Sequence, residues 1–124
     1  MSRYRPELVH IELKRDAWLD PHHEIRSPAD GVSAVQRLIG NIDRECVVSL
    51  NLSSKGKVIN ASICHMGTID QCLVGIPEVF RSVIASGSSS MILIHSHPSG
   101  GHIVPSEEDL YLTRRVAAAE SIMN

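Results

Sequence analysis

The pattern of hydrophobic and polar positions begins with a strand-like stretch near the N-terminus. Val9, Ile11 and Leu13 alternate with polar residues, which predicts an edge strand that enters a helix or loop by Trp18. Residues 20–26 contain a proline and two adjacent histidines, so a surface loop is expected there.

A helical pattern follows the loop. Ser27 and Pro28 predict the helix start, because serine accepts hydrogen bonds from free N–H groups and proline needs no donor at the first helical position. Gly40 predicts the end. The apolar residues at helical spacing are Val32, Val35, Leu38 and Ile39.

The rest of the chain alternates between strands and helices. The expected elements are a strand over 46–52, a turn over 53–56, a returning strand over 57–64, a helix from Pro77 to about Gly87, a strand over 91–94 and a helix opening at Ser106. The run at 91–94 is apolar throughout, as expected of a central strand covered on both faces. This order predicts an α/β fold with a mixed central sheet and flanking helices.

Length and charge narrow the function classes. A chain of 124 residues with 43% hydrophobic residues suits one soluble domain. The net charge of −2 provides no broad positive field, so nucleic-acid binding has little support. A small basic cluster near the N-terminus is expected to be a solvated face; it consists of Arg3, Arg5, Lys14 and Arg15.

Cysteine usage and the absence of long apolar runs bear on location. The 3 cysteines are odd in number and lack CxxC spacing, which fits neither a disulfide framework nor a thiolate zinc site. The N-terminus shows no apolar signal segment, and no run approaches the roughly 18 apolar residues of a membrane helix. We therefore expect a cytoplasmic protein without membrane association.

The candidate chemistry lies at the end of the strand over 91–94. Positions two apart in an extended chain share a face, so His95 and His97 can present both imidazoles to one point. Asp109, in the first turn of the last predicted helix, could complete a His-His-Asp set with a fourth position left for water, as catalytic zinc requires. Glu45, just before the strand over 46–52, is the best candidate for a proton shuttle.

Each of these residues also has a simpler explanation. Paired histidines at a strand end are often polar residues leaving the core, and Ser106 with Asp109 resembles a helix capping box. Glu45 could be an ordinary surface charge. His65 is expected to be a core or edge residue rather than a second metal ligand.

Taken together, these motifs resemble a known family. A glutamate before a strand, then HxHPSG at 95–100 and PSxxD at 105–109, is similar to the RadC-like branch of the JAB/MPN (JAMM) metallopeptidases. The resemblance implies a cytidine-deaminase-like architecture and hydrolysis of a peptide or isopeptide amide in a peptide or protein substrate. It further implies zinc bound by His95, His97 and Asp109, Glu45 as general acid and base, and Ser106 as a hydrogen-bond donor to the oxyanion.

The sequence departs from the family pattern in three places. The loop between His97 and Ser106 is one residue longer than usual, which makes Glu108 the reserve ligand in place of Asp109. Family members continue into further strand, so we expect residues 26–124 to be a JAB domain that stops short at its C-terminus. Residues 1–25 form a strand and loop segment too short for the helix-hairpin-helix module common in RadC proteins.

Two rival functions remain open from sequence alone. One is a DNA-repair or mobile-element accessory module that keeps the metal site and acts by binding. The other is a scaffold domain in which the site is only structural. Whichever function holds, an exposed strand edge near the chain end favours a homodimer.

Overall fold

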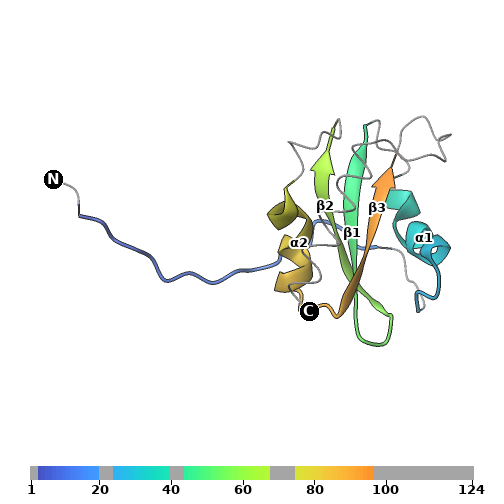
Figure 1. Ribbon diagram of the computed structural model, residues 1–124, viewed down its shortest axis with the longest axis horizontal. Helices are drawn as coiled ribbons and strands as arrows, with labels where there is room; N and C mark the ends of the chain where they lie inside the picture. The colour runs from blue at the N-terminus through green and yellow to red at the C-terminus, as the bar shows by residue number, and fades with distance from the viewer. Residues whose placement is uncertain (1–2, 20–23, 40–43, 68–74, 97–124) are drawn as a thin grey trace.

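Two helices cover opposite faces of a three-stranded sheet in the computed structural model, which describes residues 3–19, 24–39, 44–67 and 75–96 (Figure 1). The elements in chain order are α1 (Pro28–Ile39), β1 (Cys46–Leu52), β2 (Val58–Met66), α2 (Ile76–Ala85) and β3 (Ser90–Ser96). The predicted α/β class is confirmed. Each of these elements corresponds to one expected from the hydrophobic pattern, while the helix expected from Ser106 lies outside the described residues.

The sheet has the order β2-β1-β3, and β1 is antiparallel to both neighbours. All seven residues of β1 are buried, as expected of a strand with a neighbour on each side and a helix on each face. The described strands are thus antiparallel, and the central position belongs to β1. The strand over 91–94, expected to be central, is paired with β1 alone among the described residues.

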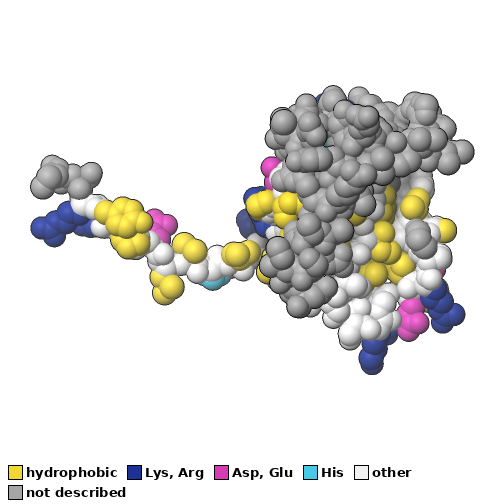
Figure 2. All heavy atoms as spheres, in the orientation of Figure 1, with side chains coloured by type: hydrophobic (Ala, Val, Ile, Leu, Met, Phe, Trp, Pro, Cys, Tyr) yellow, Lys and Arg dark blue, Asp and Glu magenta, His cyan; other side chains and the backbone are white. Residues whose placement is uncertain are grey.

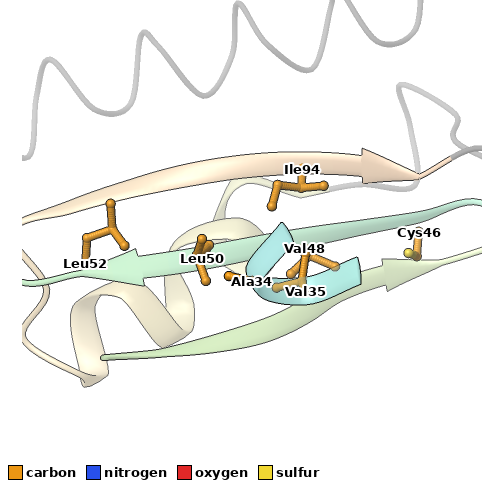
Figure 3. Close-up of a cluster of buried hydrophobic side chains, with 7 residues drawn as sticks. All are labelled: Ala34, Val35, Cys46, Val48, Leu50, Leu52 and Ile94. Atoms are coloured by element: carbon orange, nitrogen blue, oxygen red, sulfur yellow. The ribbon is translucent and has the colours of Figure 1, made fainter. Parts of the chain in front are cut away.

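One face of the sheet packs against α1. Val48 and Leu50 of β1 meet Ala34 and Val35 of α1, and Ile94 of β3 completes the contact (Figure 3). All of these side chains are at least nine-tenths buried. Removing such aliphatic groups from water is the main source of stability for a core without many aromatic residues.

The buried face of α1 differs from the predicted one at Val32. Val32 is 41% exposed, so it does not belong to the buried stripe. Gly31 lies on the buried side instead, where a Cβ atom would come within 3.1 Å of Cδ1 of Ile92. The close approach of helix and strand therefore favours glycine at this position, and Val32 is turned toward solvent.

The other face of the sheet packs against α2. Val47 of β1 and Val79 and Phe80 of α2 are buried together, with Met91 and Leu93 of β3 packed against them. Residues 46, 48, 50 and 52 thus face α1, whereas residues 47, 49 and 51 face α2. This alternation decides which face each residue near the strand ends presents.

Local hydrogen bonds fix the predicted helix boundaries. At the start of α1, Ser27 Oγ accepts a bond from the Asp30 N–H at 3.3 Å, which is the capping role predicted from sequence. At the end of α2, Gly87 has a φ of 64° and donates to Ile84 O at 3.1 Å, while Ser88 donates to Val83 O at 3.2 Å. These two bonds form a Schellman motif, for which glycine is the favoured residue.

Residues 3–19, called the N-terminal arm from here on, differ from the prediction. The arm is extended and runs away from the sheet (Figure 1). The edge strand predicted over residues 9–18 is therefore wrong for this structure, because the arm belongs to no strand ladder among the described residues. Across all four described ranges, no helix is both long and apolar enough to cross a membrane.

Candidate metal centre

The ladder between β1 and β3 brings two of the predicted site residues to one end of the sheet. His95 of β3 is paired with Val47 of β1. Glu45 comes two residues before Val47, and its carbonyl oxygen accepts a bond from the Gly67 N–H at 2.7 Å, which continues the β1–β2 ladder by one step. Glu45 and His95 are therefore diagonal neighbours across adjacent strands.

Both residues belong to the face of the sheet that α2 covers. Val47 packs against α2, and residues directly opposite each other in a ladder share a face, so His95 lies on that face too. The same alternation, continued back by two residues, assigns Glu45 to this face. Diagonal neighbours are generally about 7–8 Å apart, a spacing that a water molecule and a metal ion can span together.

The two side chains are in a partly dry environment. Glu45 and His95 are half-buried, and the Nε2 atom of His95 has less than 1 Å² of accessible surface. An imidazole nitrogen held inside the protein is a suitable metal ligand, because neutral histidine binds zinc through one ring nitrogen. A half-buried carboxylate can exchange protons with water beside it.

His65 lies on the same cross-strand row as His95. The row consists of His65 on β2, Val47 on β1 and His95 on β3, with each histidine paired to Val47. The prediction that His65 is a core or edge residue agrees with its half-buried place on the edge strand of the described sheet. Val47 lies between His65 and His95 in this row, so the two histidines are on strands that are not adjacent to each other.

Most of the predicted site lies outside the described residues. These positions are His97, Ser106, Glu108 and Asp109. Within ranges 3–19, 24–39, 44–67 and 75–96, no group of three or more His, Cys, Asp or Glu side chains is placed to hold a metal. The structure therefore brings Glu45 and His95 together and leaves their proposed partners as predictions.

The two described cysteines lie on opposite faces of the sheet. Cys46 is fully buried on the α1 face, opposite to the face of His95. Cys64 is on the α2 side, where burial raises the pKa of its thiol above the ordinary value. A thiol with a raised pKa stays protonated at neutral pH and is a poor ligand and nucleophile.

Sequence reasoning missed a polar row buried under α2. Asn51 is fully buried and donates through Nδ2 to Asn60 Oδ1 at 2.7 Å and to Ser82 Oγ at 3.1 Å. Ser49 Oγ is 3.0 Å from the same Ser82 hydroxyl. The only sequence signal is that Ser49 and Asn51 interrupt an apolar strand at alternate positions. The row fixes α2 on the sheet next to the candidate centre, because buried polar groups are costly unless they are hydrogen-bonded.

Comparison with known proteins identifies relatives over most of the chain. The sequence profile of the family described as RadC-like JAB domain matches residues 25–124. A UPF0758 protein of Rubrobacter xylanophilus is 41% identical over 99 residues, covering 80% of this chain and 43% of the relative. A UPF0758 protein of Gloeothece citriformis is 35% identical over 122 residues, covering 94% of this chain and 49% of the relative.

A third relative gives the same picture. The UPF0758 protein YsxA of Bacillus subtilis is 35% identical over 97 residues, covering 78% of this chain and 42% of the relative. The chain thus spans less than half the length of these relatives. The names of these relatives state no activity. The comparisons therefore show the family of this chain but do not assign it a reaction.

Proposed function

The chain belongs to the RadC-like JAB domain family, and from this premise we propose that it is a zinc-dependent hydrolase of peptide or isopeptide amide bonds. The observation that carries the proposal is the pairing of His95 with Val47, which puts His95 and Glu45 on one face at one end of the sheet. A metal ligand and a proton carrier are the two kinds of group that such a hydrolase needs side by side.

The donor chemistry of the proposed ligands suits zinc. His95, His97 and Asp109 would hold the ion through two nitrogens and one oxygen, with a fourth position left for water or substrate. When bound, zinc would polarise the amide carbonyl and lower the pKa of water toward about 7. The buried Nε2 atom of His95 fits this role, since a ligand nitrogen belongs inside the protein.

The chain's own residues would carry the proton steps. Glu45 would accept a proton from the attacking water and return it to the amine that leaves. Ser106 would donate a hydrogen bond to the oxygen that becomes negative during the attack. The polar row of Asn51 and Ser82 would keep α2 in place beside this reaction without touching the substrate.

The proposed substrate is a peptide or protein, and the proposed location is the cytoplasm. The 3 cysteines are odd in number and lack CxxC spacing, which supports a reducing compartment. Nucleic-acid binding is not part of this proposal, because the net charge is −2. A steep fall of binding with added salt would be the signature of that rival function.

A panel of lysine-linked isopeptides and linear peptides tests the proposed activity. We expect the zinc-loaded full chain to release free amine from at least one isopeptide, and a chelator followed by zinc to abolish and then restore that release. Amine release can be followed by mass spectrometry. Release that continues unchanged in the presence of the chelator, or none across the panel from a fully zinc-loaded chain, would contradict the proposal.

A further inference from the structure

A bulge in β2 changes the face of the sheet on which His65 lies. Between Val47 and Val48, the β1–β2 register shifts by one residue. Cys64 is the extra residue, since its neighbours Ile63 and His65 are the ones paired with β1. Strict alternation along β2 would put His65 on the α1 face with Ile63. The bulge shifts the alternation by one position, so His65 shares the α2 face with Val47 instead.

The exposure of the side chains around the bulge agrees with this assignment. Ile63 and Met66 are 38% and 44% exposed, whereas Cys64 and His65 between them are both half-buried. Met66 is paired with Cys46, which faces α1, so Ile63 and Met66 share one face although they are three positions apart. In a regular strand, residues three apart lie on opposite faces. Bulges often re-aim a side chain in this way next to a functional site.

The bulge makes His65 a diagonal neighbour of Glu45. The Gly67 N–H donates to Glu45 O, and His65 comes two residues before Gly67 on β2. Glu45, at the start of the central strand, therefore has one histidine as a diagonal neighbour on each side: His65 on β2 and His95 on β3. Diagonal neighbours on one face are about 7–8 Å apart, which is within reach of aromatic and long side chains.

We propose that a ring N–H of His65 donates a hydrogen bond to the Glu45 carboxylate and so positions it for the proton steps, an inference that rests on the proposed hydrolase function. One carboxylate oxygen accepts this bond, and the other is left for water on the side of His95. The second ring nitrogen of His65 remains for a different partner. Positioning matters because a displacement of about 1 Å can cost roughly 100-fold in rate. His65 is a positioning residue: it acts through Glu45 and binds neither zinc nor substrate.

Substitution of His65 in the zinc-loaded full chain tests the positioning role. His65→Leu removes the donor, so it should lower kcat by about 10 to 100-fold and leave KM within about twofold. His65→Gln keeps an N–H donor and should have a kcat at least about threefold above that of His65→Leu. Ser62→Ala is the matched control, since Ser62 is on the same face of β2 but opposite Ser49, away from Glu45. Its kcat should stay within about twofold of wild type.

The combination with Glu45→Gln decides whether His65 acts through Glu45. In the Glu45→Gln background, His65→Leu should lower kcat by no more than about twofold, because the carboxylate that His65 positions is already gone. If His65→Leu does not fold, the His65→Gln chain takes its place in this cycle. A His65 variant with the kcat of wild type, or a further loss of about tenfold or more in the Glu45→Gln background, would overturn the proposal.

Nitrogen NMR of the histidine rings in the full chain tests the contact without hydrolysis. Glu45→Gln should move the ring resonances of His65 by more than those of His10, because the carboxylate that accepts the hydrogen bond is lost. His10 is the reference, since the N-terminal arm on which it lies extends away from the rest of the molecule (Figure 2). Unmoved His65 resonances would overturn the proposal whether or not the chain hydrolyses amides. Moved resonances in a chain that hydrolyses nothing would support the contact and contradict the hydrolase instead.

Discussion

Glu45→Gln should lower the rate of amide hydrolysis by about 10² to 10⁴-fold while the chain keeps its zinc. Glutamine has nearly the same size and can keep hydrogen bonds, but it cannot accept a proton from water or return one to the leaving amine. Because Glu45 is a diagonal neighbour of His95 rather than a proposed ligand, its replacement leaves the ligand set intact. Steady-state rates and zinc content of the same preparation check this result.

Glu78→Gln is the matched control for that experiment. Glu78 is a half-buried carboxylate in the first turn of α2, outside the proposed machinery. Its replacement should leave the rate within about twofold, which corresponds to less than roughly 0.5 kcal/mol in the barrier. If Glu45→Gln hydrolysed at the wild-type rate, the proton transfer would have to be assigned to another group.

His95→Ala should weaken zinc binding by at least about 100-fold. Removal of a residue that only supports a ligand already costs roughly 10 to 100-fold in affinity, so removal of a ligand should cost more. Alanine also leaves a space on the α2 face next to Val47, and the folded state should be verified by circular dichroism. Competition with a chromophoric chelator measures the zinc affinity directly.

His65→Ala is the control that distinguishes the loss of a zinc ligand from the loss of a neighbouring histidine. His65 is paired with the same Val47 from the opposite side and is half-buried like His95. Its loss should change the folded state by a similar amount but leave zinc affinity near that of the wild type. Equal losses of zinc from both variants would mean that the row as a whole, and not His95 alone, supports the ion.

Periodicity was sufficient to predict the helices and strands of the described domain. Cys46–Leu52 is apolar at five of its seven positions and forms the buried central strand. Ser27 and Gly87 mark helix ends because capping depends on the residues adjacent to them. Long-range packing is harder to predict from the sequence. The inward place of Gly31 depends on Ile92, which is far away in the sequence, so the pattern alone pointed to Val32.

The candidate site shows the same limit. The spacing of His95 and His97 suggested a shared face, but only the register with Val47 relates His95 to Glu45. No local pattern contains that register, because it joins residues about fifty positions apart. The N-terminal arm is the opposite case: its alternation is strand-like, yet a strand also requires a partner, and no partner is encoded in the alternation itself.

The X-ray absorption spectrum of the zinc-loaded chain at the zinc edge tests the central claim most directly. The account predicts one zinc per chain, surrounded by nitrogen and oxygen atoms at about 2.0–2.2 Å, with imidazole scattering that weakens in His95→Ala. A sulfur shell at about 2.3 Å would assign the ion to cysteine, and a chain that takes up no zinc would leave the proposed hydrolase without its centre.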